Sequence, residues 1–387
     1  MEPADLFSKE ARVSPYRVYD GLRGSGPLQV GPSRWALLDH SDVRAALADP
    51  ASFSSNLRVL DNPVFRASPL IFDDPPRHGQ LRRLVMTALT PSRIARLVPW
   101  LRQLADGLID AMGAGPVDVV AGFANPMPVY AIARLLGVPG EQHERFKRWS
   151  HDRTFVAYHG GGRAARTPEL EAAEAGCAAL DSFLHDLVEA RRAVAEEDLI
   201  SGLVAAEVDG AKLSTTEVVG IAAVLLSAGN VTTTRLLSSL LATLSADPAQ
   251  WQRLRQERQS VEPFVEEVLR LESPVQFPAR LTTCPVELSG RTIPDGHFVM
   301  IGMGAANRDP AAFTAPEQLV PGRSEPHLAF GYGIHYCAGA ALARHEAAVT
   351  VNALLDRYRT LAQAAPPVAE EGLAHRGFAQ LVLEFRP

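Results

Sequence analysis

A single thiol, Cys337, follows a glycine-rich loop in the stretch FGYGIHYCAGA, residues 330–340. The next residues, AGAALARHEAAVTVNALLDRY, are rich in helix formers, so Cys337 is predicted to lie at a helix N-terminus. Free N–H groups and the helix dipole favour an anion there, and the thiolate is stabilised over the thiol. Gly331, Gly333 and Gly339 would let a flat ligand approach the backbone. The residues alone leave two interpretations: an inert packed cysteine, or a reactive thiolate ligand.

Other common roles for a cysteine fit this position poorly. The chain has three cysteines, Cys177, Cys284 and Cys337, which are too few and too scattered for a disulfide framework. A zinc site needs three or four ligands, and His335 with Cys337 offers at most two. A cysteine nucleophile would need His and Asp partners, and no convincing pair accompanies Cys337.

A second stretch with chemical potential, AGNVTTT, residues 228–234, interrupts a long apolar segment. Gly229 costs about 1 kcal/mol of helix propensity relative to alanine, and the threonines can hydrogen-bond to the preceding turn. The stretch therefore predicts a local break or widening of a helix. It is either a kink that relieves packing or a groove where a ligand approaches and Thr232 offers its hydroxyl.

The helix that carries this stretch is predicted to begin after Ser214. Ser214 and Glu217 form a capping-box pattern before the apolar run, and Asp247-Pro248 ends the helix. A helix of roughly thirty residues would be about 45 Å long. Because it is apolar on nearly all sides, we expect it in the core. Asn230, the threonines and Arg235 argue against a membrane span.

The composition is that of an ordinary globular protein. Of 387 residues, 47% are hydrophobic and 21% are charged, and the formal net charge is -6. This charge gives no electrostatic footprint for nucleic acid, and no basic block would hold a membrane surface. The N-terminus, MEPADLFSKEARVSPYRVYD, lacks the pattern of a secretory signal, so a cytoplasmic protein is expected. Small molecules and protein partners remain.

The order of local signals predicts a mainly helical fold with a smaller β-rich part. Short apolar runs punctuated by Gly and Pro predict strands in the first sixty residues, and helical patterns then dominate to about Leu271. The stretch PVELSGRTIPDGHFVMIG returns to strand signals, with turns at Ser289-Gly290 and at 294–296. Residues 159–169 are predicted to form a mobile loop between helices.

The motifs together resemble the cytochrome P450 superfamily in its bacterial soluble form. The haem-loop pattern of that family is matched by Phe330, Gly333, His335, Cys337, Gly339, Leu342 and Ala343. Glu267-x-x-Arg270, with Arg323, is similar to the family's structural charge cluster. The resemblance implies a single domain over residues 1–387, mainly α, with β-rich portions at about 25–60 and 275–325. It places haem between the long central helix and the helix that follows the cysteine loop.

The resemblance also implies a role for each matching residue. Cys337 would be the axial thiolate of haem iron, shielded and hydrogen-bonded by Phe330 and the loop glycines. Four cationic residues would hold the two haem propionates, because a propionate that leaves water must be paired. These four residues are His78, Arg82, Arg280 and His335. Glu267, Arg270 and Arg323 are expected to serve folding.

The oxygen-side helix of the family has the pattern Ala/Gly-Gly-x-acid-Thr. Ala228, Gly229 and Thr232 match it, but Val231 occupies the position of the acid. Proton delivery would then depend on Thr232, on ordered water, on Asn230 or on a polar group of the substrate. Thr232, Gly229 and Asn230 are therefore the catalytic candidates.

The function implied by the resemblance is a haem-thiolate monooxygenase. It would use haem b (iron protoporphyrin IX) and O2 to hydroxylate or epoxidise a mainly hydrophobic small molecule, in bacterial secondary metabolism. Electrons would come from NAD(P)H through a ferredoxin or flavodoxin and its reductase, docking near Arg83 and Arg344. A monomer without nucleic-acid or membrane partners is expected. The alternatives are oxidative aromatic coupling without oxygen insertion and, in another class, a non-catalytic haem sensor or carrier.

Overall fold

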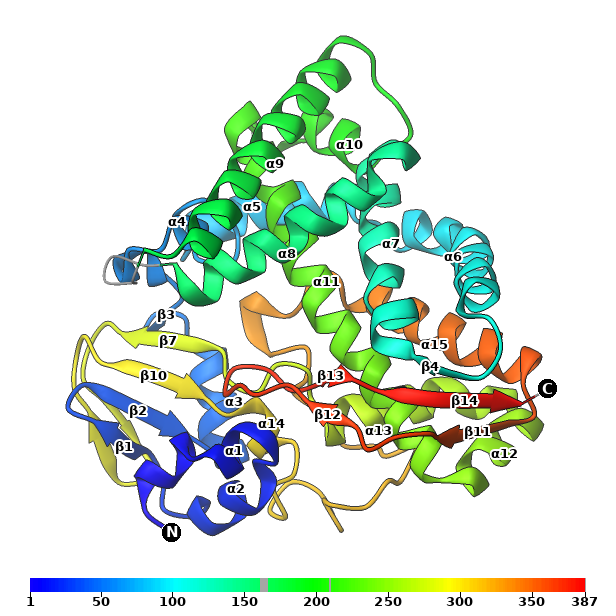
Figure 1. Ribbon diagram of the computed structural model, residues 1–387. Helices are drawn as coiled ribbons and strands as arrows, with labels where there is room; N and C mark the ends of the chain where they lie inside the picture. The colour runs from blue at the N-terminus through cyan, green and yellow to red at the C-terminus, as the bar shows by residue number, and fades with distance from the viewer. Residues whose placement is uncertain (161–165, 209, 387) are drawn as a thin grey trace. The chain divides into compact units, whose positions relative to one another are not determined.

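The computed structural model describes residues 1–160, 166–208 and 210–386. The chain forms two compact units whose segments alternate along the sequence. The first unit comprises residues 1–54, 98–124 and 232–387, and the second comprises 55–97 and 125–231. Strands dominate one part of the first unit, and helices make up most of the second (Figure 1).

The main sheet belongs to the first unit and has the strand order β1-β2-β10-β7-β3. Its strands are β1 (Leu28–Gly31), β2 (Arg34–Leu37), β10 (Phe298–Ile301), β7 (Ala279–Thr282) and β3 (Phe53–Ser54). Strand β10 runs parallel to β2, and the other pairs are antiparallel. Strands β1, β2, β10 and β7 lie side by side in Figure 1.

Alternation along β2 and β10 builds a core on each face of this sheet. Trp35 pairs with Val299, and both join one buried cluster. Their neighbours Ala36 and Met300 also pair with each other, but join a different cluster. This is the period of two that a strand imposes on its side chains. The strands predicted in the first sixty residues are therefore confirmed.

The turns predicted after residue 286 are also present. Strands β8 (Val286–Leu288) and β9 (Arg291–Ile293) form a hairpin through Ser289 and Gly290, with φ of 46° and 75°. Two consecutive positive φ angles are typical of the turn that matches strand twist, and glycine adopts them at least cost. Gly296 also has a positive φ, 72°, at the second predicted turn.

Further strands in the first unit lie outside the two β-rich stretches expected from the sequence. A three-stranded sheet has the order β11 (Thr360–Gln363), β14 (Val382–Arg386) and β4 (Pro116–Asp118). The strands β12 (Val368–Ala369) and β13 (Phe378–Gln380) form a separate antiparallel pair. The C-terminal segment thus runs out along β11 and β12 and returns along β13 and β14, as the red strands of Figure 1 show.

The helices of the first unit are mostly short, apart from α15. They are α1 (Lys9–Val13), α2 (Tyr16–Leu22), α3 (His40–Ala48), α12 (Pro248–Gln256), α13 (Val261–Leu271), α14 (Met303–Ala306) and α15 (Ala340–Arg357). Helix α13 packs against α15, and α3 against α14. Two longer helices, α6 (Pro91–Met112) and α11 (Thr215–Ala246), have residues in both units.

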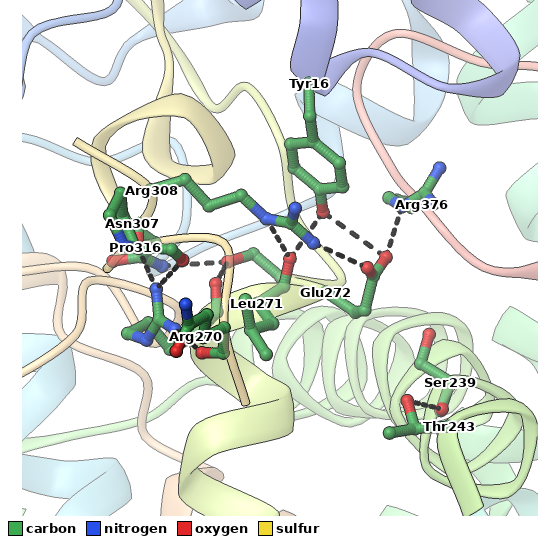
Figure 2. A network of polar contacts seen from close by, with 12 residues as sticks. Tyr16, Ser239, Thr243, Arg270, Leu271, Glu272, Asn307, Arg308, Pro316 and Arg376 are labelled. Carbon is green, nitrogen blue, oxygen red and sulfur yellow. Dashed lines mark hydrogen bonds and ion pairs between the residues drawn. The ribbon is translucent and has the colours of Figure 1, made fainter. Parts of the chain in front are cut away.

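A polar network fastens distant segments of the first unit together (Figure 2). The Tyr16 hydroxyl donates to the Leu271 carbonyl at 2.6 Å, and the guanidinium groups of Arg308 and Arg376 lie 3.4 and 5.0 Å from the Tyr16 ring centroid. Glu272 pairs with both arginines. Desolvation, and then the charge of Glu272, raise the pKa of Tyr16 to about 12. The hydroxyl therefore stays protonated and remains a donor.

The described part of the second unit is built from helices and one short antiparallel pair of strands. Its elements are α4 (Pro63–Arg66), α5 (Arg77–Ala88), α7 (Pro126–Leu136), α8 (His143–His159), α9 (Pro168–Ala193), α10 (Leu199–Ala205), β5 (Glu207–Val208) and β6 (Ala211–Lys212). Helices α8 and α9 pack along each other. The predicted loop at 159–169 lies between them, but its residues 161–165 are outside the described residues. Asn62 caps α4 and donates to carbonyls of Val156 and Ala157.

Helix α11 begins and ends where the sequence predicts. The backbone N–H of Ser214 donates to Glu217 Oε2 at 2.9 Å, and the Glu217 N–H donates to Ser214 Oγ at 3.3 Å, which completes the capping box. The helix ends at Ala246, and Asp247 caps α12. Residues 228–234 are α-helical throughout, so the predicted break is wrong.

Length and composition alone would allow α11 to cross a membrane, since one window of 18 residues has a mean hydropathy of 1.3. The interrupting polar residues therefore do not exclude a span by themselves. However, the core helix of a soluble protein passes the same test. All residues from Leu236 to Leu241 are at most 1% exposed, as expected of a helix in the core.

Candidate functional site

The cysteine loop is a tight turn that ends just before α15. The N–H of Cys337 donates to the Phe330 carbonyl at 2.9 Å, and the N–H of Tyr336 donates to the Gly333 carbonyl at 3.1 Å. Gly339 is the N-cap of α15, which starts at Ala340. Cys337 is exposed. The prediction of a thiol at a helix N-terminus is confirmed, and the backbone fixes the position of this thiol on both sides.

Two loop glycines have positive φ angles that explain their identity. Gly331 has a φ of 75° and Gly333 a φ of 72°, a conformation that L side chains rarely adopt. A Cβ at Gly333 would also lie 2.6 Å from the Leu47 carbonyl, at the end of α3. Gly333 is thus required by the close approach of the loop to α3, in addition to any approach of a ligand.

The four predicted anion-binding residues divide between the two units. The first unit contributes Arg280 on β7 and His335, two residues before Cys337 in the loop. The second unit contributes His78 and Arg82 on α5. The spacing of His78 and Arg82 puts them on one face of that helix, and His78 is buried. Each unit therefore presents one pair of basic side chains.

A narrow strip of α11 remains accessible in the middle of the helix. Ala228 is exposed and Thr232 is half-buried, whereas Leu226, Asn230 and Thr233 are buried. Ala228 and Thr232 are four residues apart and share one helix face. Val231, also half-buried, borders the same strip. The catalytic candidate Thr232 thus lies on the accessible face, beside the position that lacks a carboxylate.

Gly229 and Asn230 face neighbours within the second unit. A Cβ at Gly229 would lie 3.1 Å from Ile132 Cδ1, so this position brings α11 close to α7. The Asn230 side chain donates from Nδ2 to Ser150 Oγ on α8 at 2.8 Å, and both residues are buried. Asn230 therefore links α11 to α8 through its amide.

Arg235 is a functional candidate that in the sequence appears only as an interruption of the apolar run. Its Nε and Nη2 atoms lie 2.7 and 2.6 Å from Glu370 Oε2, and the two side chains are 10% and 32% exposed. A Cβ at Gly377 would lie 2.5 Å from Arg235 Cγ, so the β12–β13 connection packs on the arginine stem. Desolvation, and then the charge of Arg235, lower the pKa of His375 to about 3.

The sequence contains one signal for this site. Arg235 interrupts an apolar helix, and a buried charge there requires a partner of opposite charge. The sequence gives no register between α11 and residue 370, so it did not identify the partner. The Arg235–Glu370 pair ties the C-terminal hairpin to α11 within one turn of Thr232.

The predicted structural charge cluster is present and fully formed. Arg270 donates from Nε and Nη2 to Glu267 at 2.9 and 2.8 Å, and Arg323 donates from Nε to Glu267 at 2.9 Å. Burial acts to raise the pKa of Glu267, but the hydrogen bonds from Arg270, the Val320 N–H and Arg323 outweigh it and lower the pKa. The carboxylate is therefore held in its charged form.

The neighbouring carboxylate, Glu266, changes the interpretation of Arg344. Arg344 donates from Nε and Nη2 to the two oxygens of Glu266 at 2.7 and 2.8 Å. This side chain was expected to offer positive charge to a redox partner. Its charge is already paired in the structure, so it contributes little net attraction to such a surface.

The donor set fits an iron porphyrin better than a bare metal ion. Among the described residues, no group of three or more His, Cys, Asp or Glu side chains could hold a metal ion. A metal at Cys337 would therefore have to bring its other ligands with it, as iron in porphyrin does. The thiol is exposed at the loop, and the basic side chains of Arg280 and His335 suit carboxylate groups of the same cofactor.

Comparisons with known proteins agree with this chemistry. The family model described as Cytochrome P450 matches residues 165–381. Cytochrome P450 109 of Bacillus spizizenii is 34% identical over 93% of this chain and 88% of that protein. Cyclomarin C epoxidase CymV of Salinispora arenicola is 36% identical over 95% of each. The solved structure of CYP109Q5 from Chondromyces apiculatus has a TM-score of 0.88 and 34% identity, and the match covers 97% of this chain and 96% of that one.

Proposed function

This chain belongs to the cytochrome P450 family of haem-binding monooxygenases, and from that premise we propose that Cys337 supplies the thiolate that binds the haem iron. The observation that carries this proposal is the cysteine loop. It presents an exposed thiol between the Phe330 carbonyl and the start of α15. The dipole at the N-terminus of α15 favours the thiolate form, which is the form that binds iron.

The haem would be held by residues that complement its two propionate groups and its thiolate side. His78, Arg82, Arg280 and His335 would pair with the propionates, because charge-assisted hydrogen bonds offset the loss of hydration. Phe330, Gly333 and Gly339 would line the thiolate side, where the backbone of α3 leaves no room for a larger side chain at Gly333. The haem, when bound, supplies the activation of O2 for the monooxygenase reaction.

Thr232 would orient the water that carries protons along α11. Its hydroxyl lies on the accessible strip of α11, and Val231 beside it provides no carboxylate. A hydroxyl can accept and donate one hydrogen bond at once, so Thr232 can orient water at this position. Gly229 would keep α11 close to α7. Asn230 would assist by fixing α11 against α8 through Ser150.

The substrate would be a mainly hydrophobic small molecule that is hydroxylated or epoxidised in bacterial secondary metabolism. Similar proteins include the cyclomarin C epoxidase and an erythromycin C-12 hydroxylase, and CYP109E1 from Bacillus megaterium has been solved in complex with corticosterone. Bacterial members of the family typically take electrons from a ferredoxin and its reductase. We propose that a ferredoxin or flavodoxin delivers electrons from NAD(P)H to this chain through its reductase. We also propose that the protein is monomeric and cytoplasmic.

The decisive experiment is the absorption spectrum of the reduced, carbon-monoxide-bound protein. We expect the band that is typical of haem with a thiolate ligand, and its loss in the variant Cys337→Ala. Cys284→Ala, at another exposed cysteine, is the control and should keep the band. A colourless protein expressed with ample haem precursor would overturn the proposal, as would an unchanged band in Cys337→Ala.

A second candidate, oxidative aromatic coupling, is favoured by one observation. Val231 removes the carboxylate from the accessible strip, and oxygen insertion depends on proton delivery there. Turnover under labelled O2 separates the two reactions. Label in the product supports hydroxylation or epoxidation, and an unlabelled dimer or crosslink supports coupling.

The variant Thr232→Ala tests the proton role. We expect haem binding to persist while less product forms per electron and more peroxide is released, because water near the oxygen is no longer oriented. Thr243→Ala is a matched control. Thr243 lies about three turns after Thr232 on α11, and its hydroxyl donates to the Ser239 carbonyl. Equal product per electron in Thr232→Ala and the unmodified protein would remove Thr232 from the mechanism.

A further inference from the structure

The guanidinium group of Arg344 is held along its edge and on its face. Along the edge, Nε and Nη2 donate to the two oxygens of Glu266 at 2.7 and 2.8 Å. On its face, the Cζ atom lies 4.5 Å from the centroid of the Phe330 ring. The remaining nitrogen, Nη1, donates to the Tyr336 hydroxyl at 3.3 Å. A planar fork that is fixed in this way fixes the ring beneath it.

Glu266 also reaches the backbone beside Phe330 through a second side chain. His327 Nδ1 accepts the Ala329 N–H at 3.2 Å, and His327 Nε2 lies 3.2 Å from Glu266 Oε2. Since Nδ1 accepts, Nε2 carries the proton and donates to the carboxylate. Glu266 thus holds the Phe330 ring through Arg344 and the chain before Phe330 through His327. The Phe330 carbonyl in turn accepts the Cys337 N–H.

The contacts that fix Arg344 and Glu266 are more numerous than a contribution to folding stability would require. The Arg344 and Glu266 side chains are 37% and 40% exposed, and exposed ion pairs contribute about 0–1 kcal/mol to folding. Burial acts to raise the pKa of Glu266, but the hydrogen bonds from Arg344 and His327 lower it to about 2. Both charges are therefore present at neutral pH. The positive charge lies over the Phe330 ring, at the start of the cysteine loop.

We infer that Glu266 is a positioning residue for the Cys337 thiolate, and that the Glu266–Arg344 pair balances the charge beside the cysteine loop. This inference rests on the proposed function, because it concerns the electron affinity of iron bound at Cys337. Reduction adds one electron to that iron, so an unbalanced positive charge nearby favours reduction and an unbalanced negative charge opposes it. The charges of the carboxylate and the guanidinium offset each other only while both side chains are present.

The test is the reduction potential of the holoprotein, measured by spectroelectrochemical titration. Glu266→Gln leaves the Arg344 cation unbalanced and should raise the potential. Arg344→Gln leaves the Glu266 anion unbalanced and should lower it. The double variant should return close to the potential of the unmodified protein. A loop that is merely loosened would move both single variants in the same direction, so the opposite signs distinguish charge balance from damage.

A second measurement tests positioning independently of charge. Amide hydrogen exchange of the segment 328–340 should be faster in the double variant than in the unmodified protein, because the Phe330 ring is no longer clamped. The matched control is Glu262→Gln, an exposed carboxylate one turn earlier on α13. It should change neither the potential nor the exchange.

The outcomes separate this inference from the proposed function. If the unmodified protein lacks the thiolate spectrum, the proposed function fails and the inference fails with it. If that spectrum is present, two results overturn only the inference. One is that Glu266→Gln and Arg344→Gln shift the potential in the same direction or leave it unchanged, and the other is that Glu262→Gln shifts it as much as Glu266→Gln.

Discussion

Two adjacent glutamates on α13 have opposite surroundings. Glu267 is 3% exposed and receives hydrogen bonds from Arg270, Arg323 and the Val320 N–H. The Glu266 side chain is 40% exposed and pairs with Arg344 beside the cysteine loop. Neighbouring positions on a helix point about 100° apart, so one carboxylate enters the core while the other stays near the surface. The comparison separates two tasks: the buried cluster holds the fold, and the half-exposed pair adjusts the site.

The largest expected effect is the loss of unfolding free energy when Glu267, the buried glutamate, is changed. Glu267→Gln leaves Arg270, which is 1% exposed, without its carboxylate, and an uncompensated buried charge costs about 3–5 kcal/mol. Urea unfolding of the holoprotein measures this cost. Glu266→Gln on the same helix is the control. If the two variants lost equal stability, burial would not be what divides the tasks.

A third ion pair provides an intermediate case. Arg235 and Glu370 are 10% and 32% exposed, between the other two pairs. Glu370→Gln should cost about 1–3 kcal/mol, the range for a hydrogen bond to a charged group that loses its partner. The double variant Arg235→Met/Glu370→Gln should recover part of this loss, because no buried charge is left unpaired. A double variant less stable than Glu370→Gln would mean that the arginine stem, rather than its charge, holds the hairpin.

The features that the sequence predicted correctly are local ones. The capping box at Ser214, the turn at Ser289-Gly290 and the thiol before α15 each depend on residues within a few positions of one another. Glu267 and Arg270 are also one turn apart, so their pairing follows from helix spacing. The fold class could be predicted because strand signals come first along the chain, helical patterns follow, and strand signals then return.

The features that the sequence missed depend on distant partners. The Arg235–Glu370 pair spans 135 positions, and the pairing of β14 with β4 joins the C-terminus to residues 116–118. Arg344 looked like a free cation because the sequence shows its charge and not its partner. The predicted break in α11 was wrong because the propensity cost of Gly229, about 1 kcal/mol, is small beside the packing of a 32-residue helix.

Glu346 is a second deeply buried carboxylate, and its surroundings differ from those of Glu267. Glu346 on α15 is 1% exposed, and its Oε2 atom has no hydrogen-bond partner among the described residues. Desolvation raises its pKa to about 8. Burial is therefore the same as for Glu267, but the direction of the pKa shift is opposite, because no cation compensates it.

The raised pKa of Glu346 gives stability a pH dependence. The contribution is complete below the unfolded pKa, about 4.5, and is lost as the pH rises toward 8, with a slope of up to about 1.4 kcal/mol per pH unit. Glu346→Gln should remove this slope. Urea midpoints at several pH values between 5 and 8 measure it. Parallel profiles for the variant and the unmodified protein would show that Glu346 is ionised in the folded state.

The smallest effect on stability is expected for the half-exposed pair. Glu266→Gln should cost less than about 1 kcal/mol, because solvent screens the pair and both side chains must be ordered to form it. The cost should shrink further at high ionic strength, whereas the cost of Glu267→Gln should not, because salt screens exposed charges far more than buried ones. Urea unfolding at low and high salt measures both. A salt-independent loss of several kcal/mol in Glu266→Gln would place this carboxylate with the fold-holding cluster, and its effect on the cysteine loop would then be a consequence of unfolding.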